Sequence, residues 1–176
     1  ASVYNQLSST VHYDNVFIIG SSHYADFEGA SIYSEGNFIT PLGMARVNIP
    51  LAKALSDDNP GIFKSYPEAH AAEHSLEVQI PFLQYIYKDD LQIVPILLGT
   101  QNESTCKKIA AALSPYLNEH NLFIISTDFS HYPGYPDACK VDELTAESIL
   151  KNSPASFMRT IKNNETLGIS NLATSV

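Results

Sequence analysis

Short apolar runs alternate with longer segments of helical periodicity along most of the chain. Three runs are rich in β-branched and aromatic residues and are bounded by turn residues, which predicts strands buried on both faces: residues 16–20, 91–99 and 122–126. Pro95 lacks the N–H of a ladder donor, so it favours an edge strand or a bulge in the second run. The alternation is typical of βα units. We therefore predict a three-layer α/β/α fold with a central, mostly parallel sheet.

Four further segments carry apolar residues at helical spacing and are expected to be helices: residues 76–87, 104–117, 141–150 and 154–161. Ser75 precedes the first of them and can cap it by accepting hydrogen bonds from backbone N–H groups. Pro81 lies inside that helix, which implies a kink or a later start. Residues 29–48 are interpreted as a hairpin inserted after the first strand, with Gly36 and Asn37 between its arms.

Composition predicts one hydrophobic core and argues against two classes of partner. The chain has 176 residues, of which 44% are hydrophobic and 16% charged, so we expect a single domain over residues 1–176. Its 19 acidic residues outnumber its 10 lysines and arginines, the formal net charge is -9, and the sequence has no basic cluster. A nucleic-acid partner is therefore not expected. A membrane partner is not expected either, because no apolar run approaches the roughly 20 residues that span a bilayer.

The two ends of the chain bear on whether the domain is whole, and the cysteines bear on its redox compartment. The chain starts at Ala1 in a stretch typical of the tail of a helix, and it stops at Val176 with no pattern that ends a helix or a strand. We therefore expect the domain to be truncated at both ends. Cys106 and Cys139 are too few for a disulfide framework and lack Cys-x-x-Cys spacing, which fits a reducing, cytoplasmic compartment. The sequence leaves the oligomeric state open.

Polar loops that carry histidine follow two of the predicted strands. His23 comes shortly after the first strand, and Asp128 and His131 come after the third. Because ligands bind outside the carboxyl ends of parallel strands, we predict that these three side chains line one pocket. The imidazole of His23 can bind a metal, act as a base or only make a loop hydrogen bond. The carboxylate of Asp128 can orient His131 or stabilise its charged form, unless it only caps a turn.

A third histidine loop opens the helix predicted at residues 76–87. His74 can belong to the pocket or only to the start of that helix, and Glu73 and Glu77 can be solvated charges that favour a helix N-terminus. Three other histidines lie in polar connecting stretches and are interpreted as structural: His12, His70 and His120. A serine nucleophile is not supported, because there is no Gly-x-Ser-x-Gly elbow. A phosphate or dinucleotide loop is not supported, because Gly20 has no glycine-rich continuation.

Four sequence blocks occur in an order that resembles the MEMO family, also called AmmeMemoRadiSam system protein B. They are Gly-Ser-Ser-His at 20–23, Glu-His-Ser-Leu-Glu-Val-Gln-Ile-Pro-Phe-Leu at 73–83, Val-Pro-Ile-Leu-Leu-Gly at 94–99 and Ser-Thr-Asp-Phe-Ser-His-Tyr at 126–132. The resemblance implies the fold of class III extradiol (LigB-type) dioxygenases, which hold non-haem Fe(II) at the carboxyl ends of strands. It implies that His23 is a metal ligand and that His131 is an acid/base catalyst, with Asp128 and His74 beside it.

The sequence departs from the family pattern in ways that concern the metal. Members usually carry a Pro-His-Ala-Gly-Tyr segment before the position of Ala1 and a Cys-Gly segment after Val176, each with a further metal ligand. Many members also have Pro-Ser-His-His where this chain has Ser-Ser-His-Tyr, so Tyr24 takes the place of a second histidine. We therefore expect iron(II) or copper in the full-length protein, and little or no metal bound by this chain.

Two kinds of function remain open on this basis. The first is a metal-dependent oxidoreductase that acts on a small molecule. The second is a non-catalytic protein that uses the same pocket to recognise a peptide or another partner. The pair of Asp128 and His131 favours chemistry, because recognition alone needs no acid/base pair. The missing ligand segments favour recognition or an inactive fragment.

Overall fold

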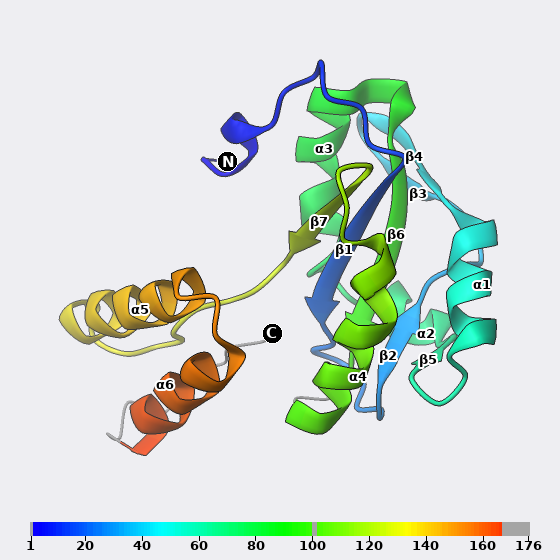
Figure 1. Cartoon of the computed structure of the whole chain (residues 1–176). Coiled ribbons are helices and arrows are strands. Elements are labelled where there is room, and N and C mark those ends of the chain that lie inside the picture. The colour runs from blue at the N-terminus through cyan, green and yellow to red at the C-terminus, as the bar shows by residue number, and fades with distance from the viewer. Residues whose placement is uncertain (1, 100–101, 167–176) are drawn as a thin grey trace. The chain divides into compact units, whose positions relative to one another are not determined.

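The protein folds into two compact units, Ala1–Ser126 and Thr127–Val176. The structure is a computed structural model that describes residues 2–99 and 102–166 (Figure 1). The expectations that residues 1–176 form a single domain and that the domain is truncated at both ends stay predictions, and residues 1 and 167–176 lie outside the described residues.

A mixed sheet of seven strands forms the centre of the first unit. Four of its strands run parallel in the order β4-β6-β1-β7: β1 Asn15–Ser21, β4 Gly43–Val47, β6 Gln92–Leu98 and β7 Asn121–Ile125. The other three are short: β2 Ala30–Ile32 runs antiparallel to β6, β3 Phe38–Thr40 antiparallel to β4, and β5 Phe63–Lys64 parallel to β2. The three strands predicted from the apolar runs are confirmed as β1, β6 and β7, but the burial on both faces predicted for β7 is wrong, because β7 is an edge strand of the described sheet and its residues are half-buried or exposed.

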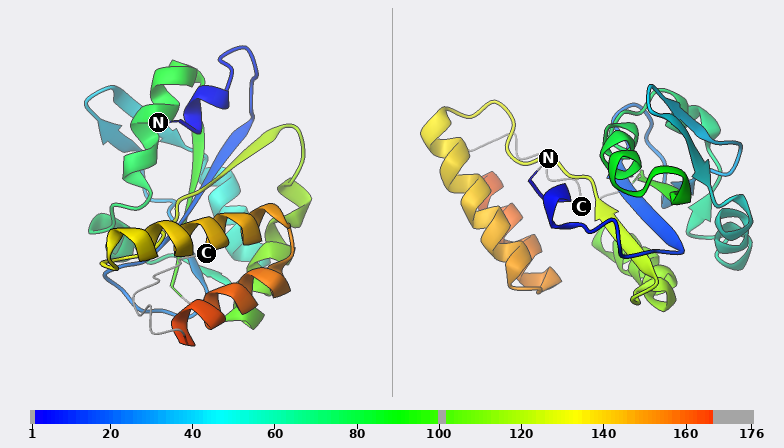
Figure 2. Two further views of the ribbon diagram at one scale, coloured as in Figure 1. Left: turned by 90° about the vertical axis from the view of Figure 1, so that its left-hand side faces the viewer. Right: turned by 90° about the horizontal axis from the view of Figure 1, so that it is seen from above.

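Helices cover both faces of this sheet, as the view from above shows (Figure 2). One face packs against α3 (Ile80–Tyr87) through Val16, Ile18, Ile80, Leu83, Ile93 and Leu97. The other packs against α1 (Ile49–Asp58) and α4 (Glu103–Leu113) through Phe17, Ile19, Ala52, Leu55, Val94, Ile96, Ile109 and Leu113. Successive residues of β1 alternate between these two cores, because side chains of a strand point to opposite faces in turn. The predicted three-layer α/β/α fold is confirmed.

The helix predicted at residues 76–87 starts later than its apolar spacing suggests. A 3₁₀ turn, η2 (Glu77–Gln79), comes first, and α3 begins at Ile80 with Pro81 in its first turn. A proline is tolerated there because the first N–H groups of a helix have no intrahelical partner. The described residues contain three further 3₁₀ segments: η1 Tyr4–Gln6, which precedes β1, η3 Lys88–Asp90, and η4 Ser114–Tyr116, which continues α4.

Pro95 does not mark a sheet edge, because β6 is an internal strand. The Pro95 carbonyl accepts a hydrogen bond from the backbone N–H of Tyr33 at 3.1 Å. The N–H and C=O of one strand residue point to the same side, so the missing N–H faces that side too. There the pairing with β4 ends at Ile93 and the pairing with β2 starts at Ile96. Pro95 therefore lies where β6 changes its neighbour from β4 to β2, and its missing N–H removes no hydrogen bond from either pairing.

The expected hairpin over residues 29–48 is only partly present. β3 and β4 form it, while β2 pairs with β6 instead of with either arm. Asn37 does not make the turn between the arms. Its side-chain Oδ1 accepts a hydrogen bond from the backbone N–H of Val47 at 2.9 Å and so ties the entry of β3 to the end of β4.

The described part of the second unit, up to residue 166, contains two helices, α5 (Tyr135–Leu150) and α6 (Pro154–Thr166). They confirm the helices predicted at residues 141–150 and 154–161, and both are longer than the apolar spacing indicates. The first unit also contains a short helix, α2 (Pro67–Ala71). None of the helices in the described ranges is both long enough and apolar enough to cross a membrane.

Candidate metal site

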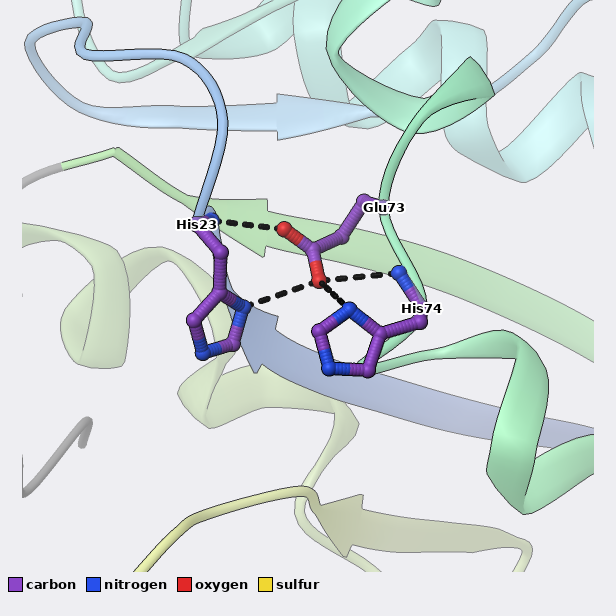
Figure 3. Close-up of side chains that lie close together, drawn as sticks. All are labelled: His23, Glu73 and His74. Atoms are coloured by element: carbon purple, nitrogen blue, oxygen red, sulfur yellow. Dashed lines mark hydrogen bonds and ion pairs between the residues drawn. The ribbon is translucent and has the colours of Figure 1, made fainter. Parts of the chain in front are cut away.

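Two of the predicted site histidines lie side by side at the carboxyl end of β1. His23 comes two residues after β1 ends at Ser21, and His74 lies in the loop between α2 and η2. The centroids of the two rings are 5.0 Å apart (Figure 3). The loop after a parallel strand therefore carries His23 to the place that the sheet geometry predicts, and a loop some 50 residues later in the sequence meets it there.

A buried carboxylate, Glu73, joins the two histidines. Only 1% of its side chain is exposed. Its Oε2 accepts a hydrogen bond from the backbone N–H of His23 at 2.6 Å, and its Oε1 lies 2.9 Å from the ring Nδ1 of His23. The same Oε1 lies 3.3 Å from the ring Nδ1 of His74. The interpretation of Glu73 as a solvated charge is therefore wrong.

Hydrogen bonds keep the Glu73 carboxylate ionised in spite of its burial. Burial by itself would raise the pKa of the carboxyl group, because desolvation disfavours the charged form. Hydrogen bonds from the backbone N–H groups of His23 and Ser75, and from the His23 ring, favour the charged form and outweigh that effect. Together they lower the pKa of Glu73 to about 2. At neutral pH, Glu73 is therefore a buried anion that accepts hydrogen bonds.

Ser75 ties the Glu73 loop to the end of β1. Its hydroxyl donates a hydrogen bond to the backbone carbonyl of Ser21 at 3.0 Å. The expectation that Ser75 caps the following helix is wrong, because α3 starts after Gln79, at a distance from Ser75. Gly20 permits this close approach, since a Cβ atom at that position would lie 2.7 Å from the Ser75 hydroxyl oxygen.

The site has groups of the right kind and spacing for a transition-metal ion. His23, Glu73 and His74 each offer one ligand atom, and these atoms all lie within 4.8 Å of one another. The His23 side chain is 35% exposed and that of His74 is 54% exposed, so solvent reaches both imidazoles. In each ring, the nitrogen that does not face Glu73 points away from the carboxylate (Figure 3). Imidazole suits iron, copper and zinc.

The other two predicted site residues contact each other in the second unit. Asp128 Oδ2 lies 3.3 Å from His131 Nε2. The His131 Nδ1 lies 2.9 Å from the backbone carbonyl of Phe129, and since a carbonyl only accepts, this nitrogen carries the hydrogen. Nε2 is then the nitrogen that faces the carboxylate. The catalytic role of this pair, and the pocket that it was predicted to share with His23, stay predictions.

His70 was predicted to lie in a polar connecting stretch, but it is a buried residue of the short helix α2. Its Nε2 lies 3.0 Å from the Ser31 hydroxyl oxygen, and its Nδ1 has no hydrogen-bond partner among the described residues. Burial lowers its pKa to about 4, and the opposing effects of Ser31 and of the negative charge of Glu73 are smaller. The preceding Ala69, which is buried as well, was the available sign of a packed position.

The His70 pKa predicts a loss of stability in weak acid. The His70 side chain binds a proton near pH 6.5 in the unfolded chain and only near pH 4 in the folded chain. The stability that neutral His70 contributes is therefore fully present above pH 6.5 and is lost as the pH falls from 6.5 to 4. His70→Gln keeps a polar neutral group beside Ser31 but has no imidazole to protonate. Between about pH 7.5 and 5, we expect the free energy of unfolding of this variant to fall by about 2 kcal/mol less than that of the native chain. Urea unfolding at both pH values measures this.

A matched control is His12→Gln, because the His12 side chain is 74% exposed. This variant should lose stability between the two pH values as the native chain does. If His70→Gln also keeps the native dependence on pH, His70 is not buried as the structure has it.

Comparisons with known proteins agree on one family. A family model described as "Memo-like protein" matches residues 1–170. The MEMO1 family protein Ta0237 of Thermoplasma acidophilum is 42% identical over 126 residues, which are 72% of this chain and 45% of that protein. A MEMO1 family protein of Aeropyrum pernix is 33% identical over 165 residues, 92% of this chain and 58% of that protein. A MEMO1 family protein of Methanobrevibacter smithii is 35% identical over 152 residues, which are 85% of this chain and 53% of that protein.

The chain thus spans about half the length of the curated relatives that it matches. The sequence blocks around His23, His74 and His131 predict the same family. With a family match that extends over nearly all of its residues, the chain belongs to the MEMO family.

Proposed function

We propose that this chain carries part of the site of a metal-dependent oxidoreductase that acts on a small molecule, with His23 as a ligand of iron(II) or copper. The observation that carries the proposal is the pair of exposed imidazoles, His23 and His74, whose rings lie 5.0 Å apart on one buried carboxylate at the end of β1. Metal-ligating histidines almost always pair their second ring nitrogen with a carboxylate, a carbonyl or water. His23 and Glu73 have this arrangement.

Other groups of each unit would supply the rest of the proposed chemistry. A bound iron(II) or copper ion would supply one-electron redox chemistry. His74, beside His23 and more than half exposed, can hold a proton at the edge of the site. His131 is the proposed acid/base catalyst of the second unit, because its Nε2 lies 3.3 Å from the Asp128 carboxylate. The paucity of cysteines fits the proposed reducing, cytoplasmic compartment.

Recognition without turnover is the second candidate function. Tyr24 is 67% exposed, and its ring lies 6.2 Å from that of His74, so an aromatic ring and two imidazoles form one accessible cluster. Such a cluster suits a peptide or another partner that binds through aromatic contacts. In this case the protein would bind its partner in the same pocket and consume no dioxygen.

Metal titration of the chain and of a His23→Ala variant tests the proposal. We expect weak binding of Cu(II) or of Fe(II) under anaerobic conditions by the native chain, and an affinity at least about 10-fold lower in the variant, since it loses a ligand. Equilibrium dialysis followed by elemental analysis measures both. His120→Ala is the control, because that side chain is 67% exposed and lies outside the cluster.

The results separate the two functions. Equal affinities of the native chain and His23→Ala would show that His23 is not a ligand. No binding by the native chain would reject the metal site, and the accessible cluster would then be tested with peptides. Dioxygen uptake with catechol-like substrates would support the oxidoreductase.

A further inference from the structure

The Glu73 carboxylate is already surrounded by donors. Its Oε2 accepts from the His23 backbone N–H at 2.6 Å, and its Oε1 lies 2.9 Å from the His23 ring Nδ1. The backbone N–H groups of His74 and Ser75 also donate to Oε1, each at 2.9 Å. A carboxylate offers about four lone-pair positions. Three of these four donors share Oε1, the oxygen that faces both imidazole rings, so a metal ion at Oε1 would have to displace a donor, although Glu73 is close enough to the histidines to be counted as a ligand.

We propose that Glu73 is a positioning residue, which fixes the ring of His23 and directs its Nε2 to the metal, and not a metal ligand itself. This inference rests on the proposed function of His23. Glu73 holds His23 at two points, the backbone nitrogen and the ring Nδ1, so both the loop and the ring orientation are set by one side chain. Figure 3 shows the second ring nitrogen of His23 on the side away from the carboxylate.

The chemistry of the pair decides which nitrogen carries the hydrogen. An ionised carboxylate only accepts hydrogen bonds, so the His23 Nδ1 must be the donor in their 2.9 Å contact. In the neutral ring the other nitrogen, Nε2, then has the lone pair. A metal ion binds a lone pair, and the carboxylate also makes the imidazole a stronger base. Glu73 therefore selects the tautomer in which Nε2 is the ligand atom.

Burial and hydrogen bonds fix the position of Glu73 and of its loop. Its side chain is 1% exposed, and its own backbone nitrogen contacts the His70 carbonyl at 3.4 Å, at the end of α2. The Ser75 hydroxyl binds the Ser21 carbonyl, which fixes the same loop to β1. A site held by buried groups on a rigid sheet keeps its geometry when ligands arrive.

The ring tautomer of His23 tests the inference without any metal. Long-range ¹H–¹⁵N NMR of the native chain, at a pH about two units above the ordinary histidine pKa, distinguishes the two neutral tautomers. We expect hydrogen on Nδ1 of His23. A ring with its hydrogen on Nε2 would overturn the inference, whatever the chain does with metal.

Metal titration of a Glu73→Gln variant tests the consequence. Glutamine has one acceptor oxygen, and its NH₂ group would face donors, so the two-point hold on His23 is lost. We expect Cu(II) or Fe(II) affinity to fall about 10- to 100-fold, as for other residues that support a ligand, and the preference for the Nδ1–H tautomer to disappear. Glu77→Gln is the matched control, because Glu77 is an exposed acid four residues further on.

The outcomes are distinguishable from those of the His23 experiment. A folded Glu73→Gln variant with native affinity and tautomer would overturn the inference. Spectroscopic proof of a carboxylate ligand in the native complex would overturn it too. If Glu73→Gln does not fold, the tautomer of the native chain still decides. If the native chain binds no metal, the proposed function fails, and the tautomer alone shows whether Glu73 positions the His23 ring.

Discussion

Replacing Phe17 by alanine is expected to lower the free energy of unfolding by about 3–5 kcal/mol. Phe17 lies in the middle of β1, and none of its surface is exposed. Its ring stacks on Phe123 of β7 with centroids 4.5 Å apart, and it contacts Tyr116 at 5.5 Å. Alanine would leave a cavity between the sheet and the helices on that face. The aromatic pairs add to the cost, because each contributes beyond its buried area.

Urea unfolding followed by far-UV circular dichroism measures the loss. Ile39→Ala is the matched control, because Ile39 also lies in a strand but is 84% exposed. This control should change the unfolding free energy by less than about 0.5 kcal/mol. A loss at Phe17 no greater than that of the control would mean that this face of β1 is not packed as described.

The strands were predictable because burial on both faces leaves a clear pattern in sequence. β1 shows it in Val16, Phe17 and Ile18, which are almost fully buried and alternate between the two cores. Helix α1 was missed, although signs of its start were present. Asn48 caps it by accepting from the Leu51 N–H at 3.1 Å, and a proline lies in its first turn.

The candidate site was predictable only in part. The position of His23 follows from local order along the chain, because it comes directly after a buried strand. The burial of Glu73 does not follow from local order. It depends on the meeting of two loops 50 residues apart, and before that meeting a glutamate beside a histidine and a serine is typical of a solvated helix start. Ser75 was misinterpreted as a cap for the same reason.

Hydrogen bonds at the end of β6 hold both ends of the loop that carries His23. The Ser22 N–H donates to the Leu98 carbonyl at 2.9 Å, and the Gly99 N–H donates to the Gly29 carbonyl at 3.1 Å. Between these two points the chain bends so that Phe27 covers Gly99. The position of His23 therefore depends on close contact at Gly99 as well as on Glu73.

Gly99→Ala is expected to lower the free energy of unfolding by about 3 kcal/mol, the upper end for overpacked sites. A Cβ atom at Gly99 would clash with the Phe27 ring and with the Phe27 backbone carbonyl, and a backbone atom cannot rotate aside. The loop that carries Phe27 and His23 would have to move. We therefore also expect several-fold weaker metal binding in this variant.

The matched control is Gly61→Ala, because a Cβ atom at Gly61 would meet no described atom within 4 Å. This control should unfold within about 0.5 kcal/mol of the native chain and bind metal as the native chain does. Urea unfolding and metal titration of both variants separate the two effects. A Gly99→Ala variant that loses stability but keeps native metal affinity would show that Glu73 alone holds His23 in place. A variant with native stability would contradict the contact between Gly99 and Phe27.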